Sequence, residues 1–123
     1  MAARRPPPRN DQQSLDLRPA DDHEARGAGE NQLGTVYSKT GDIGQALRHY
    51  QRSIQHQEAR GDIYAAGQTR YNIALLLTGD GQISDALHYG RAALDNFRQA
   101  GPGAASGVAN VERLIATLEM GSR

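Results

Sequence analysis

Apolar and small residues recur at helical spacing between residues 21 and 120, in segments that glycine interrupts. The first segment has Asp21 or Asp22 as a candidate N-cap and stops at Gly41, which suits the left-handed residue that ends many helices. The pattern predicts further helices over residues 43–59, 62–79, 83–99 and 108–120. In the second helix one apolar face is formed by Ile43, Ala46, Leu47, Tyr50 and Ile54. The chain is therefore predicted to be all-α.

The skeleton of this pattern repeats after forty residues. The stretch LGTVYSKTGDIGQALRHYQRSI, which begins at Leu33, matches IALLLTGDGQISDALHYGRAAL, which begins at Ile73. Glycines follow the same period in two sets, which are Gly27, Gly67 and Gly107, and Gly41, Gly81 and Gly121. Glycine inside a helix costs up to about 1 kcal/mol against alanine, so its recurrence at one repeat position predicts a close approach of neighbouring backbones. A fixed period of this length indicates stacked repeats.

These residues resemble the tetratricopeptide repeat in a forty-residue form. Repeat one carries the family's signature at Leu33, Gly34, Tyr37, Gly41, Ala46, Tyr50 and Ser53. Repeat two carries it at Ile73, Ala74, Leu77, Gly81, Ala86, Gly90 and Ala93. The resemblance implies a helical-hairpin repeat, an α-solenoid, with two full repeats (residues 21–60 and 61–100) and a C-terminal capping helix (residues 101–120). Residues 1–20, which contain RRPPPR, are predicted to be a disordered arm before this 21–120 domain.

The resemblance also implies how the hairpins pack. Ala46 and Ala86 are expected at the helix crossings, where only a small side chain fits. Gly34 and Ala74 are expected to face them. The large residues around the crossings are Leu33, Tyr37, Tyr50, Leu77 and Leu94. Because Gly90 replaces the usual aromatic residue, repeat two is expected to be less well filled. Helix five fits the period after a shift of one residue, which places on its packed face Val111, Leu114, Ile115 and Leu118.

Composition narrows the class of partner. The formal net charge is zero, which argues against strong attraction to nucleic acid or to an acidic membrane. The sequence has no cysteine, so disulfides and thiolate metal sites are excluded. It has no run of about 20 apolar residues, and MAARRPPPRN lacks the apolar segment of a secretory signal. These features predict a cytoplasmic protein with neither nucleic acid nor membrane as a partner.

No motif that carries chemistry stands out. The sequence has no phosphate loop, no HExxH, no GxSxG and no EF-hand spacing. His49 and His56 are seven residues apart rather than four, and no third ligand accompanies them, so they are interpreted as surface histidines. The RGD at residues 60–62 is interpreted as a helix stop followed by an N-cap. We predict no catalytic residue, no metal and no cofactor, and hence no enzyme.

In the resembling family, the first helix of each hairpin lines a concave groove that binds an extended or helical peptide. The positions that the resemblance implies are Ala28, Asn31, Gln32, Thr35 and Ser38 in repeat one, and Gln68, Tyr71, Asn72, Leu75 and Thr78 in repeat two. Amide side chains both donate and accept hydrogen bonds, so this set suits recognition of a peptide main chain. Asn72 is the leading candidate for contact with the peptide, and the alternative for it is a solvated position on an exposed helix face. Tyr71 is expected either to face the ligand or to pack against the neighbouring repeat.

The leading hypothesis is thus a non-enzymatic protein–protein interaction module that binds a peptide segment of another protein. One alternative is self-association as a homodimer, through an apolar stripe of Val108, Val111, Ile115 and Leu118. Another is a regulatory tail of a larger bacterial regulator, which rests on analogy with arrays of similar repeats.

Overall fold

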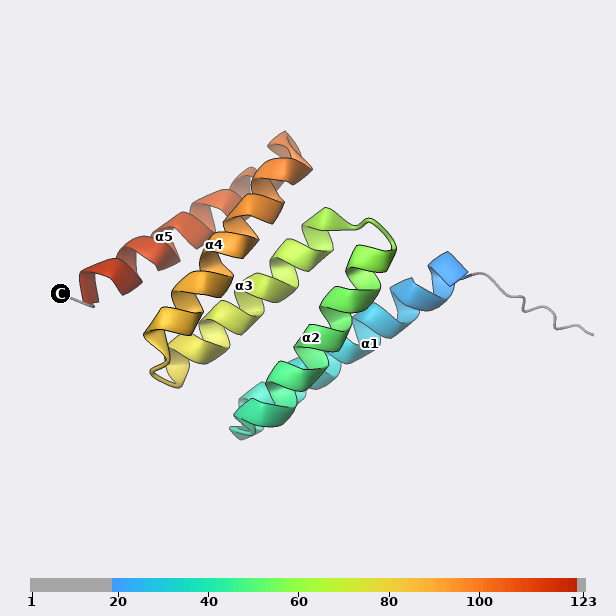
Figure 1. Cartoon of the computed structure of the whole chain (residues 1–123), viewed down its shortest axis with the longest axis horizontal. Helices are drawn as coiled ribbons and strands as arrows, with labels where there is room; N and C mark the ends of the chain where they lie inside the picture. The colour runs from blue at the N-terminus through green and yellow to red at the C-terminus, as the bar shows by residue number, and fades with distance from the viewer. Residues whose placement is uncertain (1–18, 122–123) are drawn as a thin grey trace, which may run out of the picture.

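The computed structural model describes residues 19–121, and every regular element in that range is helical (Figure 1). The elements are α1 (Pro19–Thr40), α2 (Ile43–Ala59), α3 (Ile63–Gly79), α4 (Ile83–Ala100), the 3₁₀ turn η1 (Pro102–Ala104) and α5 (Ala105–Gly121). The prediction of an all-α helical-hairpin repeat is confirmed. The predicted arm, except for its last two residues, lies outside the described residues.

Two predicted helix starts were wrong. The first helix begins at Pro19, so neither Asp21 nor Asp22 is its N-cap. Proline is compatible with a helix start because its missing N–H would have no partner there. The last helix begins at Ala105 rather than at residue 108, directly after the turn that Pro102 opens. It continues through Gly107, although glycine lowers helix propensity.

Left-handed glycines end each of the first four helices. The φ angles are +83° at Gly41, +74° at Gly61, +78° at Gly81 and +94° at Gly101. The carboxylate of Asp62 caps α3 by accepting from the backbone N–H of Ala65 at 3.0 Å, which confirms that RGD is a helix stop and an N-cap. Gly121 is different, because it is the last residue of α5 and is absent from the positive-φ set.

The helices form two antiparallel hairpins that lie side by side, with α5 packed along α4 (Figure 1). Within the hairpins, α1 pairs with α2 and α3 pairs with α4, while α2 also packs against α3. The predicted capping role of α5 follows from its position. Its inward face consists of Val111, Leu114, Ile115 and Leu118, and Val111 and Leu118 are buried among the chain's own side chains. Of the apolar stripe predicted for self-association, Val111 and Leu118 are thus buried within the chain, and Val108 and Ile115 are partly buried.

Small residues lie where the helices of each hairpin cross. Ala46, Ala74 and Ala86 are all fully buried, as predicted. Gly34 faces the ring of Tyr50, because a Cβ at Gly34 would lie 2.6–2.9 Å from three ring carbons. The prediction for Leu33 was wrong, since this side chain is exposed and fills no space at the crossing.

The space beside Gly90, which the sequence predicts to be poorly filled, is occupied by a side chain of α5. A Cβ placed on Gly90 would lie 3.4 Å from Cγ1 of Ile115, so the Ile115 side chain of α5 lies directly over this glycine. Gly90 itself is buried. The capping helix thus supplies the bulk that an aromatic residue supplies elsewhere, and repeat two is not underfilled at this position.

The crossing alanines give a first prediction. Ala46→Leu and Ala86→Leu each force a larger side chain into a site with no exposed surface, which we expect to lower the free energy of unfolding by about 1–3 kcal/mol. Thermal unfolding followed by circular dichroism measures this loss. Ala109→Leu on the exposed side of α5 is the matched control and should leave the melting temperature nearly unchanged. Unchanged midpoints in both crossing variants would contradict this packing.

Candidate functional site

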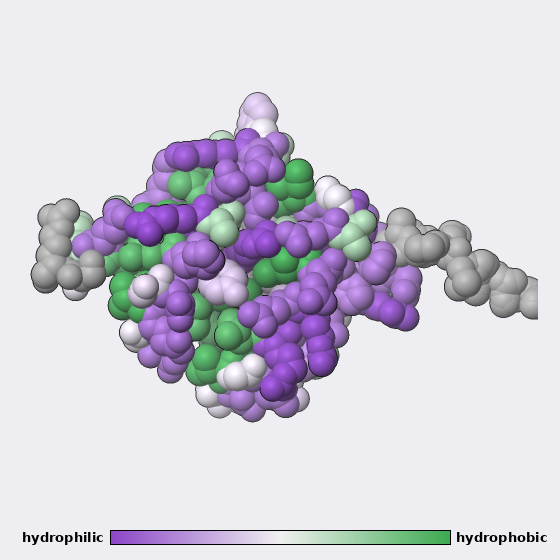
Figure 2. Space-filling model, in the orientation of Figure 1, coloured by the Kyte–Doolittle hydropathy of each residue, from purple (hydrophilic) through white to green (hydrophobic). Residues whose placement is uncertain are grey.

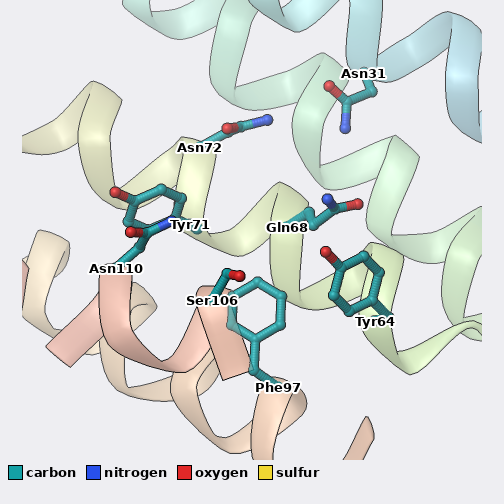
Figure 3. Close-up of a pocket in the computed structure, with 9 residues that line it drawn as sticks. Asn31, Tyr64, Gln68, Tyr71, Asn72, Phe97, Ser106 and Asn110 are labelled. Carbon is teal, nitrogen blue, oxygen red and sulfur yellow. The ribbon is translucent and has the colours of Figure 1, made fainter. Parts of the chain in front are cut away.

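A hollow of about 390 Å³ opens between α1, α3 and α5, and we call it the amide hollow (Figure 3). Its lining residues are Asn31, Tyr64, Gln68, Tyr71, Asn72, Phe97, Ser106, Gly107 and Asn110. Asn31 projects into it from one side and Asn110 from the other, with the α3 residues between them (Figure 3). All nine are uncharged at neutral pH, so the hollow presents hydrogen-bonding groups and aromatic rings without a net charge.

One face of α3 forms the floor of the amide hollow. Tyr64, Gln68, Tyr71 and Asn72 are spaced by four, three and one residues, which brings them to one side of the helix. The opposite side of α3 is used for the core, where Ile73 and Leu77 are buried. The helix therefore divides its residues between packing and the hollow.

The amide groups of the hollow differ in how they are engaged. Asn31 donates from Nδ2 to Oγ1 of the buried Thr69 at 2.8 Å, which fixes its orientation across the two repeats. Asn110 accepts from the Arg113 guanidinium at 3.2 Å. Among residues 19–121, neither Gln68 nor Asn72 has a side-chain hydrogen-bond partner. These two amides therefore offer both donors and acceptors to a bound molecule.

Aromatic side chains support one end of the hollow. The rings of Tyr64 and Phe97 lie 5.5 Å apart between centroids, at an interplanar angle of 57°. Phe97 is buried, whereas Tyr64 is exposed. Tyr71 lines the hollow and also packs, partly buried, against the cluster that contains Phe97. The two roles considered for it in the sequence therefore occur together.

Several predicted groove residues lie outside the amide hollow. The Thr35 hydroxyl lies 2.9 Å from the Tyr50 hydroxyl and 3.2 Å from the Asn31 carbonyl oxygen, so its hydrogen bonds are made within the first hairpin. Thr78 likewise donates to the Ala74 carbonyl oxygen at 2.7 Å. The structure places Gln32 and Leu75 on exposed helix surface outside this lining. Ala28 and Ser38 also lie outside it.

Five lining residues were missed by the sequence analysis: Tyr64, Phe97, Ser106, Gly107 and Asn110. Tyr64 could have been found, because it lies one helical turn before Gln68 on the same face. Gly107 keeps the forty-residue spacing from Gly67, but Ser106 and Asn110 carried no such signal, because the apolar period shifts by one residue in α5 and its start was predicted too late. Phe97 comes from α4, the second helix of its hairpin, which the groove pattern does not include.

The histidines are more engaged than predicted. The His49 Nδ1 lies 2.5 Å from a carboxylate oxygen of Glu30, and its ring stacks on Tyr37 with centroids 5.3 Å apart. His23 and His56 share a hydrogen bond between their Nδ1 atoms at 2.8 Å. Both contacts link α1 to α2, so these residues hold the hairpin together and are not simply solvated. In the described part of the chain, no three potential metal ligands of the His, Cys, Asp or Glu type gather at one place.

On the face shown in Figure 2, hydrophobic residues appear between hydrophilic ones and form no single broad patch. No helix within residues 19–121 has both the length and the apolar character needed to cross a bilayer.

Comparison with known proteins gave one match. A family model described as a tetratricopeptide repeat matches residues 25–99. The matched segment includes most of α1, all of α2 and α3, and all but the last residue of α4, so it contains the lining residues of the amide hollow that come from α1, α3 and α4. No curated protein and no solved structure matches the chain.

Proposed function

The chain belongs to the tetratricopeptide repeat family, and on this premise we propose that it is a non-enzymatic interaction module whose amide hollow binds an extended segment of a partner protein. Repeats of this family generally mediate protein–protein interactions and are typically non-catalytic. The observation that carries the proposal is the pair of unpartnered amides, Gln68 and Asn72, on the floor of the hollow.

The chemistry of the hollow favours a main-chain ligand. A peptide unit presents one N–H and one C=O, and a side-chain amide matches both at once. The uncharged lining offers nothing to a strongly acidic or basic segment, so the partner segment is expected to be neutral where it enters. The exposed ring of Tyr64 adds an apolar surface on which one aliphatic or aromatic side chain of the partner can rest.

This proposal predicts that Asn72→Ala weakens binding without unfolding the chain. Two lost main-chain hydrogen bonds at about 0.5–1.5 kcal/mol each correspond to a loss of affinity of about 5- to 150-fold. The probe would be the best-binding neutral peptide selected from a random library against the full chain, with the dissociation constant measured by isothermal titration calorimetry. Because no charge pair is involved, raising the salt from 50 to 500 mM should change affinity little.

Gln55→Ala is the matched control, since it removes an exposed amide from α2, which lines no part of the hollow. It should bind the selected peptide within about twofold of the unaltered chain. If the two variants bind equally well, or if every selected peptide is highly charged and released by salt, the amide hollow is not the main-chain binding site.

A further inference from the structure

The outer face of α1 is apolar where the corresponding face of α3 is buried. Leu33 is 45 % exposed, but Ile73, forty residues later at the same repeat position, is 0 % exposed. Val36 is 55 % exposed, whereas its counterpart Leu76 is 7 % exposed. The two repeats therefore have the same kind of side chain at these positions and differ in what covers it.

On α3 this cover is supplied by α2, and no helix within residues 19–121 occupies the corresponding place on α1. Each hairpin is followed by an equivalent neighbour, because α3 follows the first hairpin as α5 follows the second. Helix α2 of the preceding repeat packs against α3, and α4 likewise packs against α5. Ile54 of α2 belongs to the same buried cluster as Ile73 and Leu76, and Glu58 of α2 forms an ion pair with Arg70 of α3 at 2.8 Å.

We propose that the outer face of α1, formed by Leu33 and Val36 with Glu30 at its edge, binds an amphipathic helix of a partner protein in the way that α2 lies on α3. The occupant is defined by what α2 presents to α3. Leu47 and Ile54, seven residues apart, supply an apolar stripe, and Glu58 follows one turn later. A docked helix therefore carries two aliphatic residues seven positions apart.

The charge expected on the docked helix follows from one position at which the two repeats carry side chains of opposite charge. Arg70 lies at one position of repeat two, and Glu30 occupies the equivalent position of repeat one. Since Arg70 pairs with the acidic Glu58, the helix that docks beside Glu30 is expected to carry lysine or arginine where α2 carries Glu58. Glu30 already contacts His49 through Oε1, and its side chain keeps 22 % of its exposure.

This surface is separate from the amide hollow. Leu33 and Val36 do not line the hollow, although Asn31 of the same helix does. Binding of a helix to the outer face and binding of a peptide to the hollow are therefore separate proposals. A negative result for one does not contradict the other.

The probe is a synthetic peptide that copies residues 42–60 and contains Glu58→Lys. It is titrated into the ¹⁵N-labelled full chain, and the amide shifts are mapped by nuclear magnetic resonance. We expect saturable shifts around Leu33 and Val36, a loss of affinity of at least tenfold with Leu33→Asp or Val36→Asp, and weaker binding, by several-fold, of the peptide that retains Glu58. Circular dichroism checks that both variants stay folded, as their exposed positions predict.

The matched control is Ile63→Asp, which charges a similarly exposed aliphatic residue, at 39 % exposure, at the start of α3. It should change the affinity less than twofold. The proposal is overturned by absence of saturable shifts, by shifts centred on α3, which would mean that the peptide replaces α2, or by tighter binding of the Glu58 peptide. A dimer of the unbound chain that Leu33→Asp dissociates in sedimentation velocity would also overturn it, by assigning the face to a second copy.

Discussion

Replacing Phe97 with alanine is expected to be the most destabilising single truncation in the chain. The Phe97 ring is 2 % exposed and lies between two glycines of neighbouring helices. A Cβ at Gly67 of α3 would lie 3.1 Å from this ring, and one at Gly107 of α5 would lie 2.9 Å from it. Because both helices are shaped around the ring, little can collapse into the space that it leaves, and we expect a loss of about 3–5 kcal/mol.

A loss of that size is a large part of the roughly 5–15 kcal/mol that separates a typical domain from its unfolded state. Urea unfolding followed by circular dichroism at 222 nm measures it directly. Tyr64→Ala is the control, because it removes the exposed partner of the same ring pair and should cost about 1 kcal/mol. Equal losses for the two variants would show that the glycine-lined site around Phe97 does not control stability.

Hydrogen exchange should show which helices lose stability in the Phe97→Ala variant. In repeat proteins each unit is stabilised by its immediate neighbours. Phe97 clusters with Val111 of α5 and Ala93 of α4, so the amides of α5 are expected to lose protection before those of α1 and α2.

The second large effect comes from adding a single methyl group to α1. Gly34→Ala places a Cβ 2.6–2.9 Å from the Tyr50 ring, inside the contact distance of real carbon atoms, so the ring or the helix must move. We expect this overpacking to cost about 1–3 kcal/mol. Gly29→Ala, five residues earlier on the same helix, meets nothing within 4 Å and should instead stabilise the chain by up to about 1 kcal/mol.

Thermal unfolding of the two variants under one set of conditions tests this opposition of sign. Both replace glycine with alanine in one helix, so the gain in helix propensity is the same and only the contact with Tyr50 differs. Combining Gly34→Ala with Tyr50→Leu should recover part of the loss, since the smaller side chain makes room. Two shifts of the same sign would mean that Tyr50 is not fixed against α1.

Local signals in the sequence were sufficient for most of the fold. The prediction of α2 as residues 43–59 agreed with the structure at both ends, because Gly41, Asp42 and Gly61 mark its limits chemically. The buried alanines were also predictable, because only a small residue fits a helix crossing. The prediction that Leu33 is buried was wrong because burial at this position is not a local property. Its burial depends on a helix from a preceding repeat, and no property of the residue itself reports whether that helix is present.

The candidate site was predictable only in part. Asn31, Gln68, Tyr71 and Asn72 come from helices that obey the forty-residue period, and the structure brings them together in one hollow. Whether they bind a partner is the proposal that the Asn72→Ala measurement tests. Thr35 lies outside the hollow, and its hydroxyl contacts that of Tyr50, a contact between residues fifteen apart that helical periodicity does not encode.

The spacing of the four left-handed glycines determines how far apart in the sequence the contacting helices lie. Gly41, Gly61, Gly81 and Gly101 follow one another every twenty residues, so each helix meets its partner immediately after the turn that separates them. Contacts between sequence neighbours require only short loops to close, and proteins with such low contact order fold quickly. The same arrangement lets the first hairpin form once the chain has left the ribosome as far as Ala59, before α3 to α5 have been synthesised.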